Sequence, residues 1–214
     1  MKFSSLMFVL ATLFSHGLHA ESSSGEVQLT EGVKSITIKL HGQTYVIQRN
    51  QDPRITLTDL YTNTTVGHLQ PMHLAPGVET IGELDVIDYM QRMQTDPSII
   101  LVDTRPTIWF ERLRILGAIN VPMSTFNNEL DAIEALEKYF NVKTKPNGDF
   151  DFSHAKTIVA YCNGHFCGQT PAAVKTNNYS LLKLGYPANK IKYYRGGMQA
   201  WTSVGLTVIG NEAF

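Results

Sequence analysis

The stretch Thr157-Ile158-Val159-Ala160-Tyr161-Cys162-Asn163-Gly164-His165-Phe166-Cys167-Gly168-Gln169 decides the fold of this chain. Its first five residues are an apolar run of the kind found in strands that are buried on both faces of a parallel sheet. Residues 170–174 then begin as a helix does. Backbone N–H groups converge between a strand and a helix, where they and the helix dipole stabilise a thiolate and hold an anion beside it. We therefore predict that Cys162 is a nucleophile with a lowered pKa.

Strands and helices alternate on both sides of this stretch. Apolar runs predict strands over residues 99–102, 117–121, 191–194 and 206–209. Capping signals and helical periodicity predict four helices. The first follows a capping box in residues 80–83, and the second is capped by Asn127 or Asn128. The third runs from the end of the loop after Cys162 to Leu184, and the fourth is a short helix around residues 198–201. This alternation indicates an α/β fold with a parallel sheet flanked by helices. Ligands bind at the carboxyl ends of such strands, and Cys162 lies at one of them.

The first 20 residues have the pattern of a secretory signal peptide. Lys2 supplies the positive start, residues 6–14 are an apolar stretch, and Ala20 is a small residue at a plausible cleavage site. The apolar stretch is shorter than the roughly 20 residues that a membrane span needs. We therefore expect residues 1–20 to be removed and the mature protein to be exported to a bacterial periplasm, with no membrane contact after cleavage.

Residues 21–76 have the pattern of a small β-rich extension that ends in a linker. Apolar and polar residues alternate over 36–40, His41-Gly42 can form a two-residue turn, and residues 45–47 return as a second strand. A further strand is expected around residues 55–60. The prolines and the glycine of residues 71–77 mark the linker. The main domain is then expected over residues 77–214.

Composition excludes several classes of partner. The net charge is −1, so nothing in the overall charge predicts binding to nucleic acid or to an anionic membrane. The seven histidines show no metal-ligand spacing such as His-x-x-x-His. We therefore expect no metal site and no cofactor.

Four motifs, in this order, resemble those of rhodanese (sulfurtransferase) domains. They are the strand 100–105 that ends in Asp-x-Arg, the Gly-Ala-Ile-Asn-Val-Pro step at 117–122, the strand that leads to Cys162, and the Gly-Gly-x-x-x-Trp close at 196–201. The resemblance covers roughly residues 78–210. The loop Cys-Asn-Gly-x-x-Cys-Gly-Gln is more narrowly similar to an exported bacterial subgroup.

The resemblance implies a rhodanese-type sulfurtransferase that works through a persulfide on Cys162. The thiolate would attack a sulfane sulfur in a small, thiosulfate-like anion, and a small-molecule or protein thiol would then accept that sulfur. The implied substrate-binding residues are those of the loop: Asn163, Gly164, His165, Phe166, Cys167 and Gly168. The two glycines suit a backbone that curls around an anion.

The loop departs from the family pattern because it has no arginine. The family's phosphatase relatives need Cys-x5-Arg to bind phosphate, so phosphatase chemistry is excluded. His165 is the titratable residue that could replace the arginine. Arg105 or Arg114 could add positive charge nearby, or could instead form an ion pair with Asp103 or lie on the surface. Residues 175–179 are expected as an insertion that interrupts the helix after the loop.

Cys167 leaves three alternatives open. An exported protein with two cysteines often has one disulfide. Cys162–Cys167 could be a permanent bridge in a catalytically silent binding module, or a reversible bridge in a thiol-disulfide redox protein, with Cys167 as the redox partner. In the third alternative Cys162 acts as a sulfurtransferase nucleophile, with Cys167 as a loop residue or a resolving thiol.

Overall fold

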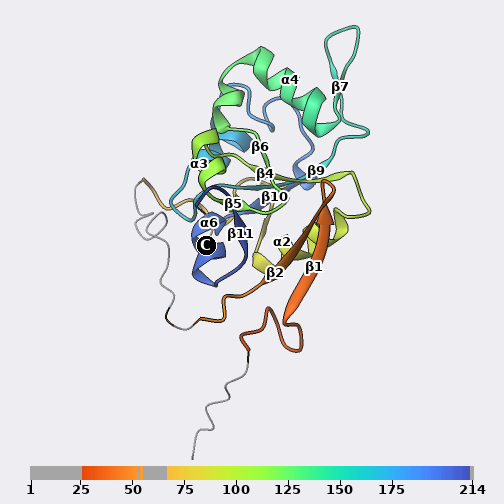
Figure 1. Ribbon diagram of the computed structural model, residues 1–214. Coiled ribbons are helices and arrows are strands. Elements are labelled where there is room, and N and C mark those ends of the chain that lie inside the picture. Colours follow the sequence, from red (N-terminus) through yellow and green to blue (C-terminus); the bar gives the residue numbers. More distant parts are fainter. Residues whose placement is uncertain (1–25, 53, 55–66, 213–214) are drawn as a thin grey trace, which may run out of the picture.

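The computed structural model describes residues 26–52, 54 and 67–212. At its centre is a five-stranded parallel sheet (Figure 1). The strands lie in the order β3 (Glu79–Ile81), β10 (Ile191–Tyr194), β9 (Thr157–Tyr161), β4 (Ile99–Asp103) and β6 (Ile119–Asn120). The predicted α/β fold is confirmed. The predicted signal peptide and the strand expected around residues 55–60 lie outside the described residues.

The two central strands are apolar because each contributes side chains to two cores. All five residues of β4 are buried, as are the last four of β9. Leu101 and Val159 belong to the core on one face, whereas Ile100 and Ile158 belong to the core on the other. Side chains of a strand alternate between its faces, so a continuous apolar run is what burial on both sides requires.

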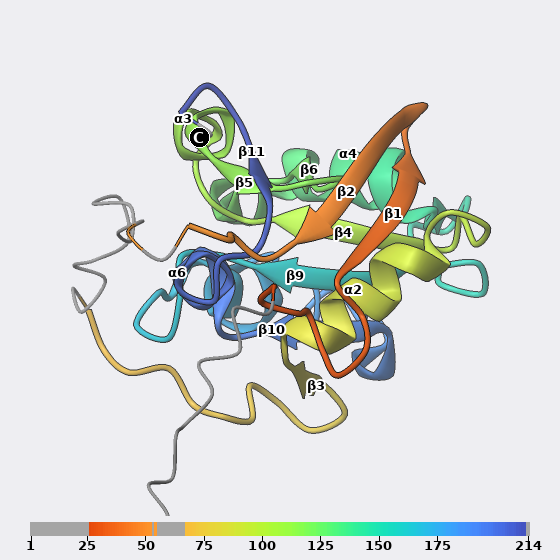
Figure 2. The same ribbon diagram turned by 60° about the horizontal axis from the view of Figure 1, so that its bottom comes forward.

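Helices α2 (Glu83–Arg92) and α6 (Gly197–Ser203) cover the first face together with the hairpin β1 (Ser35–Leu40) and β2 (Gln43–Gln48) (Figure 2). Trp201 of α6 is fully buried there, and its ring contacts Tyr194 edge to face. Two short strands, β5 (Arg114–Ile115) and β11 (Val208–Ile209), pair antiparallel at the same face.

The second face is covered by α4 (Glu129–Phe140), by the 3-10 helix η1 (Met123–Asn127) and by the segment after the cysteine loop. The predicted cap at Asn128 is confirmed, since its side chain accepts hydrogen bonds from the N–H groups of Leu130 and Asp131 at 2.8 and 3.2 Å. The remaining elements are α3 (Thr107–Arg112), the hairpin of β7 (Lys143–Thr144) and β8 (Phe150–Asp151), and the 3-10 helix η3 (Ala188–Lys190).

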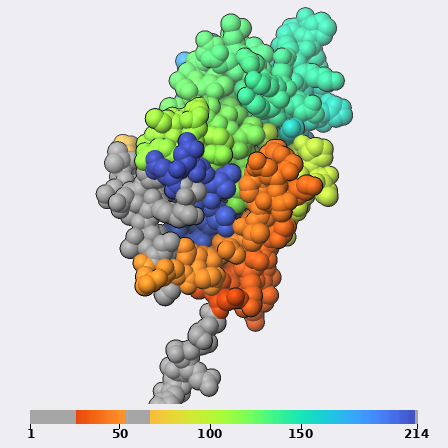
Figure 3. All heavy atoms as spheres, viewed as in Figure 1, coloured from red at the N-terminus to blue at the C-terminus, as the bar shows by residue number. Residues whose placement is uncertain are grey.

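The N-terminal hairpin is confirmed, and it belongs to the main core. His41 and Gly42 both have positive φ, 50° and 77°, which is the conformation that a two-residue turn needs. Ile38 and Ile47 are fully buried against the first face of the sheet. The chain after β2 is held to the end of α6, because the N–H of Asn50 donates to the carbonyl of Gly205 at 2.8 Å. Figure 3 shows the hairpin beside the C-terminal segment on one surface of the molecule.

The capping box predicted in residues 80–83 is wrong. Thr80 lies in β3, where it pairs with Tyr193 of β10. Helix α2 begins two residues later than the box required, with Gly82 as its cap, and the side chain of Asp85 accepts the N–H of Gly82 at 2.8 Å. Pairing with the sheet keeps Thr80 extended, and this tertiary interaction overrides the local signal.

The helix predicted to reach Leu184 is also wrong. A single turn, α5 (Gln169–Pro171), leads into a π-helical turn, η2 (Ala172–Thr176), which closes with a hydrogen bond from the N–H of Asn177 to the carbonyl of Ala172 at 3.0 Å. The chain then folds back, and the N–H of Leu181 donates to the carbonyl of Ala173. The predicted interruption at residues 175–179 is therefore confirmed. No helix in the described ranges is long and apolar enough to span a bilayer.

Candidate functional site

Cys162 follows β9 directly and lies at the carboxyl end of the sheet. Its carbonyl accepts the N–H of Met198 at 3.0 Å, and the carbonyl of Asn163 accepts the N–H of Gln199 at 2.7 Å. The loop closes on itself where the N–H of Cys167 donates to the carbonyl of Gly164 at 2.9 Å. The first turn of α6 therefore holds the start of the loop, which we call the cysteine loop (residues 162–168).

Glycine is required where the cysteine loop meets α6. Gly197 has a φ of 54°, and a Cβ atom there would lie 2.3 Å from the carbonyl oxygen of Cys162 and 2.8 Å from the amide nitrogen of Gly164. A Cβ atom on Gly164 would in turn lie 2.7 Å from the side-chain oxygen of Gln199. The backbones of Gly197 and the cysteine loop are in direct contact, so the second glycine of the Gly-Gly-x-x-x-Trp motif serves the geometry of that loop.

The Cys162 thiol is more deeply buried than its position in the sequence predicted. The residue is 2% exposed, and its Sγ donates to the carbonyl of Cys167 at 3.4 Å. Burial, and after it the hydrogen bond with Cys167, raise the pKa of Cys162 well above its ordinary value, against the opposing effect of the Thr170 hydroxyl and N–H. The predicted lowered pKa is therefore wrong for Cys162, because removal from water outweighs the local donors.

Cys167 is the better site for the thiolate. It is only partly buried, and both cysteines are free thiols. The hydrogen bond with Cys162, and after it those from the N–H groups of Gln169, Asn163 and Gly164, lower the pKa of Cys167 to about 7, against the opposing effect of burial. The convergence of N–H groups that the sequence indicated is thus present, but in the free protein it surrounds the sulfur of Cys167.

Two threonines connect the cysteine loop to β4. Thr104, which follows β4, donates through its hydroxyl to the carbonyl of Tyr161 at 2.9 Å and forms a hydrogen bond with the hydroxyl of Thr170 at 2.8 Å. Both residues are buried. Thr170 is also the residue whose hydroxyl and N–H favour the thiolate of Cys162. The sequence analysis did not single out Thr170, although it follows the loop directly.

Tyr193 is a second residue that the sequence did not single out. Tyr193 pairs with Ala160 of β9, and Cys162 comes two residues after Ala160. Alternate residues of a strand lie on the same face, so Tyr193 is on the face of the sheet towards which Cys162 continues. Its hydroxyl is buried and has no hydrogen-bond partner within residues 67–212 or the rest of the described chain. Burial, followed by the charges of Cys162 and Cys167, raises the pKa of Tyr193 above the ordinary tyrosine value. The phenol therefore lies within electrostatic reach of both sulfurs.

Arg105 lies beneath the loop, where it is fully buried. It forms an ion pair with Asp103 at 2.7 Å, as one of the sequence alternatives had it. It also donates to the carbonyl of Leu113 and, at 3.3 Å, to the side-chain oxygen of Asn163. Because the carboxylate of Asp103 neutralises it, Arg105 orients Asn163 rather than supplying a free charge. Arg114, the other candidate, donates to the carbonyl of Phe110 and lies over its ring.

The linker expected at residues 71–77 is preceded by residues that contact the cysteine loop directly. The N–H of Gln70 donates to the carbonyl of His165 at 2.8 Å, and Arg195 donates twice to the carbonyl of Gln70, at 3.0 and 2.9 Å. Gly67 approaches the carbonyl of Phe166 so closely that a Cβ atom would lie 3.0 Å away. Arg195 is thus a cationic side chain that the structure brings to the residues contacting the loop, and no local sequence pattern marks this contact.

His165, predicted as a replacement for the missing arginine, is partly buried. Burial, and after it the charge of Arg195, lower the pKa of His165 below its ordinary value. Its ring is therefore neutral at neutral pH and offers a polar contact to an anion, not a positive charge.

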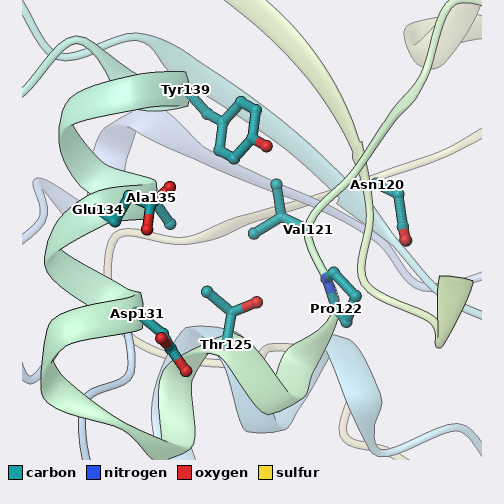
Figure 4. A pocket seen from close by; sticks show the side chains of 8 residues that line it. All are labelled: Asn120, Val121, Pro122, Thr125, Asp131, Glu134, Ala135 and Tyr139. Atoms are coloured by element: carbon teal, nitrogen blue, oxygen red, sulfur yellow. The ribbon is translucent and has the colours of Figure 1, made fainter.

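A separate cavity of about 220 Å³ lies between α4 and the segment after β6. Figure 4 shows Asp131, Glu134 and Tyr139 of α4 on one side, with Asn120 and Pro122 opposite. Neither cysteine lines this cavity. Two carboxylates in its wall make it unsuitable for a thiosulfate-like anion. In the described part of the chain, no three His, Cys, Asp or Glu side chains gather into a potential metal site.

Comparison with known proteins adds a family and several distant structures. The family model of the rhodanese-like domain matches residues 86–204, which is more than half of the chain. No curated protein matches.

The similar solved structures include the BH2092 protein of Bacillus halodurans, with 22% identity over 63% of this chain and 79% of that one and a TM-score of 0.44. A thiosulfate sulfurtransferase of Pseudomonas aeruginosa matches with 16% identity over 64% of this chain but only 21% of that one, with a TM-score of 0.43. The rhodanese-like domain of the Anabaena sp Alr3790 protein matches with 17% identity over 64% and 82% of the two chains, with a TM-score of 0.41. The family model carries the assignment: this chain belongs to the rhodanese-like domain family.

Proposed function

We propose that the protein is a rhodanese-type sulfurtransferase that forms a persulfide on Cys162. The observation that carries this proposal is the pair of free thiols in the loop that follows β9, with the Sγ of Cys162 3.4 Å from the carbonyl of Cys167. The N–H group of Thr170 acts to lower the pKa of Cys162, and those of Asn163, Gly164 and Gln169 lower the pKa of Cys167. A small dianion such as thiosulfate is the donor that these N–H groups suit. Arg195 adds a positive charge nearby.

The two thiols divide the first step between them. The pKa of Cys167 is lowered to about 7 while that of Cys162 is raised, so the step begins from the fraction of the protein in which Cys167 is a thiolate and Cys162 a thiol. As the sulfur of Cys162 attacks the outer sulfur of thiosulfate, its proton passes to Cys167. An S–S bond forms on Cys162, the S–S bond of thiosulfate breaks, and sulfite leaves with the electron pair. The product is an anionic persulfide on Cys162, which the surrounding N–H groups stabilise.

This proposal is tested by sulfur transfer from thiosulfate to cyanide. The reduced wild-type protein should turn over. On treatment with thiosulfate alone it should first gain about 32 Da, before any later reaction of the adduct, because one sulfur atom is added to cysteine. Cys162→Ser should do neither. Ser203→Ala, a change at the exposed end of α6, is the matched control and should behave like the wild type. A wild-type protein that shows no turnover and no sulfur adduct contradicts the proposal.

We also propose that residues 1–20 direct export and are removed, that the mature protein is periplasmic, and that residues 21–76 precede a rhodanese-like domain over 77–214. The apolar stretch after Lys2 and the small residue Ala20 support the first part. N-terminal sequencing of protein recovered from the periplasmic fraction should begin at Glu21. Recovery of a protein that keeps residues 1–20 in the cytosol contradicts this.

A further inference from the structure

Cys162 is much less exposed than Cys167, and this burial hinders sulfur transfer from Cys162 to an external thiol. Cys162 is 2% exposed, whereas Cys167 is only partly buried and next to exposed Gly168. Thr170, which is fully buried, and the carbonyl of Cys167 enclose the sulfur of Cys162. A small anion needs little room to reach that sulfur, but a protein thiol or a bulky thiol needs much more. Cys167 is the more accessible of the two thiols.

The same loop makes Cys167 a competent nucleophile. The sulfur of Cys162 lies 3.4 Å from the carbonyl oxygen of Cys167, and the N–H groups of Gln169, Asn163 and Gly164 help to lower the pKa of Cys167 to about 7. The hydrogen bond from the N–H of Cys167 to the carbonyl of Gly164, at 2.9 Å, bends the loop and brings Cys167 back towards Cys162. Effective concentrations inside one short loop far exceed those of external thiols. A persulfide on Cys162 would thus meet the thiolate of Cys167 before any thiol from solution.

We propose that Cys167 resolves the Cys162 persulfide, so that the protein releases hydrosulfide and then requires a dithiol reductant as its partner. This inference rests on the proposed function, since it begins from the persulfide. In the step, the proton held by Cys167 moves to the outer sulfur, and the thiolate of Cys167 attacks the inner sulfur of the persulfide. The Cys162–Cys167 bond forms, the bond to the outer sulfur breaks, and hydrosulfide leaves with the electron pair.

Atoms and electrons balance over the cycle. Two thiols are oxidised to one disulfide, and the sulfane sulfur of thiosulfate is reduced to hydrosulfide while sulfite is released. The disulfide closes a loop whose reduced form is already bent, and its more exposed sulfur, that of Cys167, is the one an external dithiol attacks. A dithiol reductant of the thioredoxin-like class returns both cysteines to thiols. The sulfurtransferase and the thiol-disulfide redox protein, which the sequence left open as alternatives, then correspond to successive steps of one reaction.

The test uses full-length mature protein, reduced and kept free of oxygen, with one equivalent of thiosulfate and no other acceptor. In the wild type, intact mass should fall by about 2 Da, one equivalent of hydrosulfide should appear, and peptide mapping should find a Cys162–Cys167 bridge. Cys167→Ser should instead keep a stable gain of about 32 Da and release hydrosulfide at least about tenfold more slowly. A dithiol added afterwards should restore the wild-type mass.

Three controls make the outcomes distinguishable. Wild type without thiosulfate should keep both thiols, which excludes oxidation by residual oxygen. A wild-type adduct that persists as it does in Cys167→Ser overturns the role of Cys167 and leaves the proposed function intact. If neither protein gains sulfur while both show a normal thermal transition, the proposed function itself fails. Should Cys167→Ser not fold, the wild-type mass and the bridge map decide by themselves, since a missing bridge overturns the inference.

Discussion

At the scale of single residues, the chemistry of the site depends on which of two sulfurs holds the negative charge. Cys162 is placed by the strand and buried by it, so its thiol keeps its proton. Cys167 is placed by the return of the loop, where N–H groups surround it. The sequence identified both residues but predicted the lower pKa for Cys162. Desolvation of a charge is a property of the folded environment, which neighbours along the chain do not reveal.

The first prediction concerns the pH dependence of alkylation. Iodoacetamide should modify Cys167 with a rate that rises through a midpoint near its pKa of about 7, while Cys162 stays unmodified over the same range. The pKa of Cys167 is lower in the folded protein than in the unfolded chain. Its thiolate therefore contributes to the free energy of unfolding at pH values above the pKa that Cys167 has in the unfolded chain. That contribution is lost as the pH falls through about 7.

The matched variant is Cys162→Ala. The hydrogen bond with Cys162 is the largest cause of the lowered pKa of Cys167. Removing it should move the alkylation midpoint of Cys167 towards the ordinary thiol value. A midpoint that stays near pH 7 in this variant would show that the N–H groups alone set the pKa.

At the scale of elements, the site is an arrangement of backbones in contact. The start of α6 accepts no side chain at Gly197, because the carbonyl of Cys162 and the amide of Gly164 occupy the space. The segment before β3 is held to the opposite side of the cysteine loop through Gln70 and Arg195. The first contact falls in the Gly-Gly-x-x-x-Trp motif, which the sequence shows, although the motif alone does not say what Gly197 contacts. The second joins residues 125 positions apart and could not be predicted, because no local pattern marks it.

The second prediction compares two glycines with positive φ. Gly148→Ala, in an open turn with φ of 86°, should cost about 1 kcal/mol of unfolding free energy, which is the strain of a left-handed alanine. Gly197→Ala should cost more than about 3 kcal/mol, or prevent folding, because its Cβ meets backbone atoms that have no flexible end to move. Denaturant unfolding measures both. Equal costs for the two variants would contradict the close contact between α6 and the cysteine loop.

Element boundaries failed where tertiary pairing competed with local signals. Thr80 has the spacing of a helix cap but lies in β3, because β10 offers it a partner. The helix after the cysteine loop ends at Thr176, and the chain turns back onto the carbonyls it leaves. By contrast, Asn128 caps α4 as predicted, since its bonds are made within its own turn. Signals that are satisfied locally could be read from the sequence; those that compete with a distant strand could not.

At the scale of the whole molecule, the N-terminal hairpin and the sheet share one core. Ile38, Leu40 and Ile47 lie in the same cluster as Leu101 and Trp201. The sequence predicted the hairpin as part of a small β-rich extension, and the structure places it over one face of the sheet. The hairpin therefore contributes to the stability of the domain that positions the cysteine loop.

The third prediction uses neighbouring residues of β2. Ile47→Ala should lower the free energy of unfolding by about 2–5 kcal/mol, because it leaves a cavity in the shared core. Val46→Ala, which faces solvent on the same strand, should cost less than about 1 kcal/mol. Both proteins should unfold in a single transition. An early, separate transition in Ile47→Ala would show that the hairpin unfolds independently of the sheet.

The sequence by itself determined the order of strands and helices, the burial of β4 and β9, the turn at His41-Gly42 and the position of Cys162 at a strand end. These follow from periodicity, apolar runs and turn chemistry, which act between residues that are close along the chain. Only the tertiary structure decided that burial raises the pKa of Cys162, that N–H groups of the loop lower the pKa of Cys167, and that Gln70 contacts both His165 and Arg195. Desolvation and contacts between distant segments exist only once the chain has folded, so no local pattern encodes them.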